Sequence, residues 1–201
     1  MIKTGILLLA AGAGKRFGGN KLSAMVDNQP MFMRAMDVID DQKKAACRLV
    51  VTGHTSILHE AKKRGWDMAV NEQPELGISW SIRLGMEKML KASPDLDGIL
   101  FMVCDQPWLT KETVGRMLTQ YEKGILALKY NGCPGNPVLF SKDYFNELMA
   151  LEGDVGGRQV MDRHKDEVYY LEILNAKELR DIDRREELNI QEDSKMRPLS
   201  I

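Results

Sequence analysis

Short apolar runs alternate with segments of helical spacing along most of the chain. Residues 4–10 and 98–104 are almost continuously apolar, which is typical of strands buried on both faces of a parallel sheet. Between them, residues 77–91 carry apolar side chains three and four positions apart, as one face of an amphipathic helix requires. This alternation over the first two-thirds of the chain predicts an α/β domain: a mostly parallel mixed sheet with helices on both faces.

The same pattern assigns an element to most other segments. Strands are predicted at residues 4–10, 48–52, 67–70, 98–104, 125–130, 137–140 and 168–173. Helices are predicted at residues 30–40, 56–64, 77–91, 110–121, 141–149 and 155–164. The segment NGCPGNP at 131–137 is predicted to be a turn. No repeat and no linker rich in proline or serine occurs, so we expect one domain over residues 1–190 and a flexible polar tail over 191–201.

The charge balance excludes one broad class of function. The 201 residues include 28 Lys and Arg against 29 Asp and Glu, for a formal net charge of -1. A general nucleic-acid-binding domain usually carries a basic excess, and single-strand binders add aromatic residues, which make up only 6% of this chain. We therefore expect no nucleic-acid partner.

The cysteines and the apolar runs indicate a compartment. Three cysteines, Cys47, Cys104 and Cys133, form no CxxC motif, so a disulfide framework or a zinc ribbon is disfavoured and a reducing compartment is favoured. No apolar run approaches the roughly 20 residues that span a bilayer. The apolar stretch at 6–11 is short for a signal peptide and suits a buried strand better. We expect a cytoplasmic protein with no membrane partner.

A glycine-rich basic loop follows the first predicted strand, in LAAGAGKRFGGNK at 9–21. Its small residues let backbone N–H groups approach an anion, and Lys15, Arg16 and Lys21 add three positive charges, which suits a triphosphate. A Walker A loop is excluded because Leu9 stands at its first glycine position and Arg16 at its Ser or Thr position. A dinucleotide fingerprint fails because Phe17 occupies the third glycine position. A plain glycine turn with solvated charges is the alternative.

Two carboxylates are candidates for a cation site. Asp105 follows a buried strand in CDQP at 104–107, where it is placed to hold Mg²⁺ against phosphate oxygens, although an Asx turn would explain it too. Asp183 is predicted to cap a short helix, with Glu186 as its capping-box partner. Ligands of parallel sheets bind at the carboxyl ends of the strands, so Asp105 and Asp183 together would form a paired-carboxylate Mg²⁺ site.

Six segments in order from residue 5 to about 188 point to one family. They are LAAGAGKRFGGNKL, GISWSIRLG, CDQPWLT, GNPVLF, LEGDVGGR and DIDRREEL. This combination resembles the molybdenum cofactor cytidylyltransferase family of the NTP-transferase superfamily. The resemblance implies a single Rossmann-like nucleotidyltransferase domain. It also implies a Mg²⁺-dependent enzyme that transfers CMP from CTP to the phosphate of molybdenum-bearing molybdopterin and releases pyrophosphate. A molybdoenzyme apoprotein that receives the cofactor would be a further partner.

The resemblance also assigns roles to residues. It implies that Arg16, Lys21 and Asp105 are catalytic, and that Asp105 and Asp183 hold the metal. The nucleotide-binding residues that it implies are Leu9, Ala10, Ala11, Gly12, Gly14, Arg16, Lys21, Gly77, Ser79, Ser81 and Asp105. On the acceptor side it implies Asn136, Asp154 and Arg158. The Ala-Ala-Gly form of the loop favours CTP over GTP.

Departures from the family pattern leave the acceptor open. The segment LSAMVDNQP replaces the usual residues after Lys21, and Gln29 stands where a lysine or arginine is usual. Two alternatives therefore remain. The first is a nucleotidylyltransferase with another phosphorylated acceptor, such as a sugar or alditol phosphate. The second is a non-catalytic NTP-binding maturation factor for molybdoenzymes. Cys104 is interpreted as a small buried hydrophobe with no chemical role.

Overall fold

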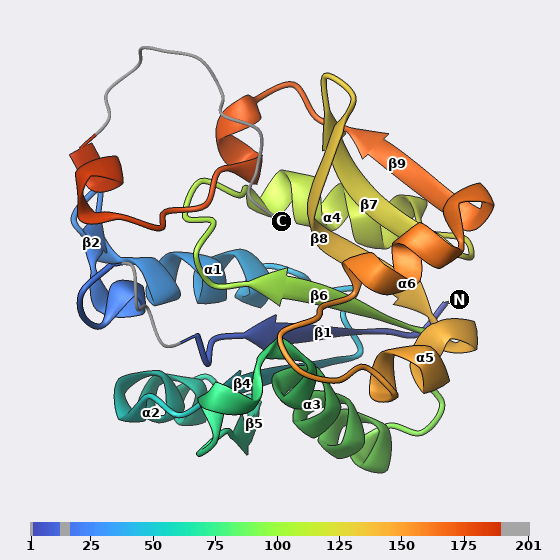
Figure 1. The fold of residues 1–201 in the computed structure, drawn as a ribbon, viewed down its shortest axis with the longest axis horizontal. Helices are drawn as coiled ribbons and strands as arrows, with labels where there is room; N and C mark the ends of the chain where they lie inside the picture. Colours follow the sequence, from blue (N-terminus) through green and yellow to red (C-terminus); the bar gives the residue numbers. More distant parts are fainter. Residues whose placement is uncertain (1, 13–16, 190–201) are drawn as a thin grey trace.

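Seven strands form one sheet in the computed structural model, which describes residues 2–12 and 17–189 (Figure 1). They are β1 (Thr4–Leu9), β4 (Cys47–Thr52), β5 (Asp67–Val70), β6 (Gly98–Val103), β7 (Ile125–Tyr130), β8 (Cys133–Ser141) and β9 (Val168–Glu172). The spatial order is β5-β4-β1-β6-β8-β7-β9. Only β8 runs against the other strands of this sheet in the described chain, which confirms the mostly parallel mixed sheet.

Helices cover both faces of the sheet, as expected. They are α1 (Met31–Asp40), α2 (Thr55–Lys63), α3 (Ile78–Ala92), α4 (Lys111–Gln120), α5 (Phe145–Met149) and α6 (Arg158–Arg163). Alternate residues of β1 feed two separate cores, because successive strand side chains point to opposite faces. Ile6 and Leu8 pack with α1, α2 and α4, whereas Leu7 packs with α3, α5 and α6. No helix of residues 2–12 and 17–189 is long and apolar enough to cross a bilayer.

The strand β8 begins four residues earlier than the pattern predicts. The turn is confined to Asn131 and Gly132, whose φ angles of 46° and 84° are those of a tight β-hairpin. The strand then resumes at Cys133 and runs through both prolines of the segment, with a register shift opposite it between Ala127 and Leu128. This irregularity leaves Asn136 and Pro137 outside the regular register, which accommodates a proline without an N–H donor, whereas Pro134 pairs with Lys129. The prediction of a strand starting at 137 was wrong for this reason.

Several other boundaries differ from the prediction. Residues 141–149 split into the 3₁₀ helix η3 (Lys142–Tyr144) and α5, and α6 starts only at Arg158. A Cβ on Gly157 would lie 2.9 Å from the Phe140 ring, so Gly157, which precedes α6, packs directly on β8. The elements that were not predicted include the small pair β2 (Met25–Val26) with β3 (Gln29–Pro30) and the 3₁₀ helix η5 (Ala176–Leu179).

One rim of the sheet gathers the segments of chemical interest. β1 and β6 are parallel neighbours, so the glycine-rich loop and Asp105 leave the sheet at the same edge. After β9 the chain returns to this rim, where the backbone N–H of Ile182 donates to the Asp105 carbonyl at 3.0 Å. In Figure 1 this orange-to-red segment runs across the molecule towards β2. It ends in the 3₁₀ helix η6 (Arg185–Asn189).

Candidate active site

A buried lysine joins the two carboxylates that were predicted to form a cation site. The Lys21 Nζ lies 2.8 Å from Asp105 Oδ2 and 2.7 Å from Asp183 Oδ1. Lys21 is 9% exposed, and burial alone would lower the pKa of its ammonium group. The two carboxylates outweigh burial and raise the pKa of Lys21, so the side chain is charged. The fold therefore brings together three predicted site residues from distant parts of the chain.

Local backbone contacts hold Asp183 in place. Glu187 Oε2 accepts from the backbone N–H of Asp183 at 2.7 Å and from that of Arg184 at 2.9 Å. The capping partner is thus Glu187, and the prediction of Glu186 was wrong. The short helix begins at Arg185, one residue later than the sequence suggested. The glutamate three positions after its N-cap is then Glu187.

The end of the glycine-rich loop is fixed by the same C-terminal segment. The Arg185 guanidinium lies over the Phe17 ring at 5.3 Å from its centroid, and its Nε donates to the Phe17 carbonyl at 3.3 Å. Gly14 and Arg16 lie outside the described residues, so their predicted phosphate contacts stay predictions.

The start of the loop is tied to β4 and then becomes exposed. The Ala10 N–H donates to the Val51 carbonyl at 2.9 Å, and the Thr52 hydroxyl donates to the Ala10 carbonyl at 2.7 Å. Ala10 is buried, Ala11 is half-buried, and a Cβ on Gly12 would meet nothing within 4 Å. The loop thus leaves a rigid strand end and opens towards solvent, as an anion-binding loop requires.

The predicted residues at the start of α3 lie against the loop before α6. Gly77 has a φ of 88°, and a Cβ there would lie 2.4 Å from the Gly153 carbonyl oxygen. The Ser79 hydroxyl donates to that same oxygen at 2.7 Å. The Asp154 Oδ1 accepts from the backbone N–H of Ile78 at 3.4 Å. These contacts dock the N-terminus of α3 onto residues 153–154.

Ser81 has a different partner. Its Oγ accepts a hydrogen bond of 2.9 Å from Asn71 Nδ2, and both side chains are buried. Ser79 and Ser81 therefore each use their hydroxyl within the protein. A role in nucleotide binding would have to act through the shape of this segment or through exchange of these hydrogen bonds.

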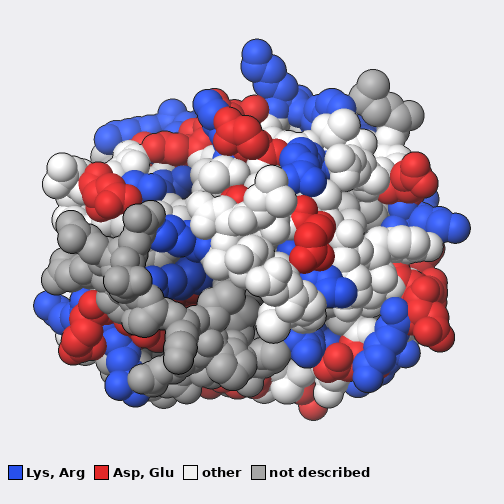
Figure 2. Space-filling view, turned by 90° about the horizontal axis from the view of Figure 1, so that it is seen from above, with Lys and Arg blue, Asp and Glu red and all other residues white. Residues whose placement is uncertain are grey.

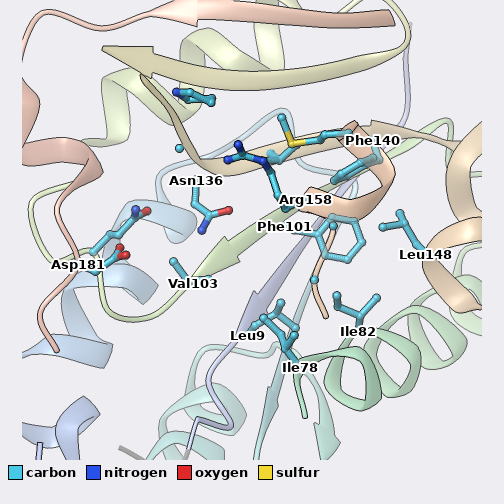
Figure 3. A pocket seen from close by; sticks show the side chains of 17 residues that line it. Leu9, Ile78, Ile82, Phe101, Val103, Asn136, Phe140, Leu148, Arg158 and Asp181 are labelled. Carbon is cyan, nitrogen blue, oxygen red and sulfur yellow. The ribbon is translucent and has the colours of Figure 1, made fainter. Parts of the chain in front are cut away.

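A cavity of about 240 Å³ opens between β6, β8, α3 and α6 at the same rim (Figure 3). Its apolar lining comes from both sheet and helices: Leu9, Ile78, Ile82, Phe101, Val103, Pro134, Val138, Phe140, Leu148 and Met161. Four polar side chains complete it: Gln106, Asn136, Arg158 and Asp181. In Figure 3, Asp181 and Asn136 lie at one end of the cavity, and Phe101, Phe140 and Leu148 lie at the other. Two of the three predicted acceptor-side residues, Asn136 and Arg158, thus line the cavity, and Asp154 does not.

Asp181 and Gln106 are site residues that the sequence reasoning missed. Burial, and then the charge of Asp105, raise the pKa of Asp181 to about 7, while a hydrogen bond from Gln106 lowers it in part. The Asp181 Oδ1 and the Gln106 Oε1 are buried and accept no hydrogen bond within the described chain. A signal was present: each lies within two residues of a predicted metal ligand, in CDQP and in DID.

The comparison with known families decides the classification. A model of the MobA-like NTP transferase domain matches residues 6–168. The chain belongs to the MobA-like NTP transferase family. This confirms the resemblance seen in the sequence, and it identifies the protein as a nucleotidyltransferase.

Relatives of this MobA-like protein cover nearly its whole length. The purine catabolism protein PucB of Bacillus subtilis (strain 168) is 25% identical over 193 residues, which are 92% of this chain and 93% of PucB. The crystal structure of Rv0371c from Mycobacterium tuberculosis H37Rv is 25% identical with a TM-score of 0.77, over 92% of this chain and 95% of that one. A second structure of Rv0371c is a complex with manganese, at 23% identity and a TM-score of 0.67, over 86% and 89%.

A cytidylyl-transferring enzyme shares the fold. The 4-diphosphocytidyl-2C-methyl-D-erythritol synthase of Anaerococcus prevotii DSM 20548 superimposes with a TM-score of 0.68 over 93% of each chain. At 13% identity the likeness extends to the fold alone. The single Rossmann-like nucleotidyltransferase domain expected from the sequence is therefore the fold of the MobA-like chain.

The donor set of the MobA-like site fits a divalent cation. Asp105 Oδ2 and Asp183 Oδ1 converge on one positively charged atom, the Lys21 Nζ, so two carboxylates already surround a cation position. Carboxylate oxygens are the ligands that Mg²⁺ and Mn²⁺ prefer. No cluster of three or more His, Cys, Asp or Glu side chains that could hold a metal occurs within residues 2–12 and 17–189. Such a cation would depend on water or phosphate oxygens for its remaining ligands.

Two further features bear on the chemistry. Burial raises the pKa of the Cys104 thiol far above its usual range, so this residue beside Asp105 is protonated and is not a nucleophile. Basic and acidic side chains are interspersed over the face of the MobA-like protein drawn in Figure 2, where the coloured residues form no broad basic area.

Proposed function

We propose that the protein transfers CMP from CTP to the phosphate of molybdenum-bearing molybdopterin and releases pyrophosphate, with Mg²⁺ as its metal. The single observation that carries this proposal is the mainly apolar cavity, whose lining includes Gln106, the residue after Asp105. A polyhydroxylated sugar or alditol phosphate would leave its hydroxyls without partners against these walls, at a cost of about 1–3 kcal/mol each. A flat ring system with few hydroxyls suits the cavity better, and molybdopterin contains one.

In this reaction an oxygen of the acceptor phosphate attacks the α-phosphorus of CTP. The bond from that phosphorus to the β-phosphate bridging oxygen breaks, and pyrophosphate leaves with the electron pair. Such a transfer needs positioning and neutralisation of charge and no protein nucleophile. The acceptor phosphate is already ionised, so no strong base is needed. The protonated state of Cys104 agrees with this requirement.

The residues take the following roles in the proposal. Lys21 and Arg16 stabilise the negative charge on the phosphate oxygens. Asp105 and Asp183 would hold Mg²⁺, which supplies further charge neutralisation at those oxygens when bound. The nucleotide lies on the loop that begins at Leu9, next to the start of α3. The acceptor lies in the cavity, with Asn136 and Arg158 at its polar end.

A pyrophosphate-release assay tests the proposal. The purified protein receives CTP, GTP, ATP or UTP with Mg²⁺, each with and without molybdenum-loaded molybdopterin. We expect release from CTP alone and only with that acceptor. The variant Asp105→Asn should lower this rate at least about 100-fold, whereas Cys104→Ala should keep it nearly unchanged because the thiol takes no part.

The other outcomes distinguish the alternatives. Release from GTP at the rate of CTP would overturn the choice of nucleotide. Release with a sugar or alditol phosphate, and none with molybdopterin, would establish another acceptor. Binding of CTP without release under any acceptor would favour the non-catalytic maturation factor. Full activity of Asp105→Asn would show that this carboxylate does not hold the metal.

A further inference from the structure

Two buried acceptor oxygens that have no partner among residues 2–12 and 17–189 lie at the polar end of the cavity. Gln106 is 3% exposed, and its Nε2 donates to the Leu179 carbonyl at 3.3 Å, whereas its Oε1 accepts no hydrogen bond from the described residues. The Asp181 Oδ1 is also buried and also accepts none from them. A buried acceptor without a donor loses the hydrogen bonds that it would make in water, which costs free energy. A ligand that supplied two N–H donors at this end would recover that free energy.

The rest of the cavity restricts the shape of such a ligand. Phe101 and Phe140 form an edge-to-face pair in the sheet, and Ile82 and Leu148 contribute from helices α3 and α5. The volume of about 240 Å³ lies below the roughly 300–1,000 Å³ of sites for drug-sized ligands. The cavity therefore suits one small ring system with apolar faces rather than a whole nucleotide.

We propose that the cavity binds a flat heterocycle whose edge carries two adjacent N–H donors, and that Asp181 and Gln106 accept these hydrogen bonds. The 2-amino-4-oxopyrimidine edge of a pterin has this pattern. Asn136, at the same end, can donate its amide N–H to the neighbouring ring carbonyl. The inference rests on the proposed function in one respect, that this ring belongs to the acceptor. It adds the two residues that select the ring.

The guanine base of a nucleotide presents the same edge, so two sources of this chemistry must be separated. Cytosine does not match, because its pairing edge has one amino donor followed by two acceptors. If the cavity takes the acceptor, free pterin should bind beside CTP. If it takes the base of a nucleotide, guanosine should bind and GTP should compete with pterin.

The test measures binding of pterin against lumazine, whose ring carries a second carbonyl in place of the 2-amino group. Titrations use the full chain without nucleotide, metal or phosphate. We expect pterin to bind at least tenfold more tightly, because lumazine places an acceptor against an acceptor. The variants Asp181→Leu and Gln106→Met should each reduce the preference to less than threefold. Glu152→Leu, an exposed glutamate outside the cavity, should keep it.

The results separate this inference from the proposed function. Equal binding of pterin and lumazine, or no binding of either, overturns the inference even if CTP releases pyrophosphate. A preserved preference in folded Asp181→Leu and Gln106→Met overturns the two assigned residues. Displacement of pterin by GTP but not by CTP overturns the acceptor as its source. Discrimination with no pyrophosphate release supports the ring site and overturns only the proposed reaction.

Discussion

At the scale of the residue, Lys21 depends on partners that lie 84 and 162 positions further along the chain. Its ammonium group separates two carboxylates that would otherwise repel each other. The carboxylates are unequally covered, with 28% of the Asp105 side chain and 46% of the Asp183 side chain exposed. Solvent screening therefore weakens the ion pairs, although the lysine itself is buried. One side chain thus serves both the fold and the proposed chemistry.

Replacing this lysine should expose the cation site. We expect Lys21→Met to lose about 1–2 kcal/mol of unfolding free energy, because two carboxylates then face each other without a cation. Mg²⁺ or Mn²⁺ should restore stability to the variant more than to the wild type, since the metal takes the place of the ammonium group. Thermal unfolding with and without each metal measures both effects.

The control is Lys63→Met, because the Lys63 side chain is 60% exposed on α2. It should unfold like the wild type and show no added response to metal. If Lys21→Met proved as insensitive to metal as this control, Asp105 and Asp183 would not form a cation site.

At the scale of the element, the start of α3 depends on close backbone contact. Gly77 approaches Gly153 so closely that no Cβ fits, and the Ser79 hydroxyl adds a hydrogen bond to the same carbonyl. This contact joins α3 to the loop that leads into α6, and both helices line the cavity. Residue 77 must therefore be glycine for two reasons: a Cβ has no space there, and the positive φ disfavours other residues.

A pair of glycine substitutions separates these two requirements. Gly77 and Gly132 have φ angles of 88° and 84°, but a Cβ on Gly132 would meet nothing within 4 Å. We expect Gly77→Ala to cost about 2–4 kcal/mol and Gly132→Ala about 1 kcal/mol, because both carry backbone strain and only the first adds a clash. Urea denaturation measures the difference. Equal losses would show that the Gly77 contact relaxes freely.

At the scale of the whole molecule, the chain after β9 completes the site. This segment, residues 173–189, supplies Asp181 and Asp183 and holds Phe17 through Arg185. Glu178 anchors it to the start of α4, because its buried Oε2 accepts from both the backbone N–H and the hydroxyl of Thr110. Residues 173–189 therefore connect the end of the glycine-rich loop, the end of β6 and α4.

Loss of this anchor should affect stability and the site together. We expect Glu178→Ala to cost about 1–3 kcal/mol, because two donors of Thr110 lose their buried partner. We also expect a higher KM for CTP, measured well below the unfolding temperature, because the segment that carries Asp183 is less firmly docked. Glu186→Ala, an exposed glutamate of the same segment, should change neither quantity. An unchanged KM in Glu178→Ala would restrict the anchor to a structural role.

The sequence by itself determined the order and type of most elements of the sheet. Buried strands read as continuous apolar runs and helices as apolar stripes, since burial acts on each element separately. The glycine-rich basic loop, Asp105 and Asp183 were also recognisable, because their chemistry lies in the residue types. The capping partner Glu187 was not, because it depends on which residue starts the helix.

Only the tertiary structure decided which of these groups meet. The pairing of Lys21 with Asp105 and Asp183 needs the strand order and the return of the chain after β9, which no local pattern encodes. The extended start of β8 needs its neighbour β7, which pairs with residues 133–135 before the register shift that leaves Pro137 outside the ladder. The oxygens of Asp181 and Gln106 are candidate ligand contacts only because the fold buries them at the same cavity. A polar residue in a sequence has no fixed environment, and it is the environment that makes an acceptor costly to leave unpaired.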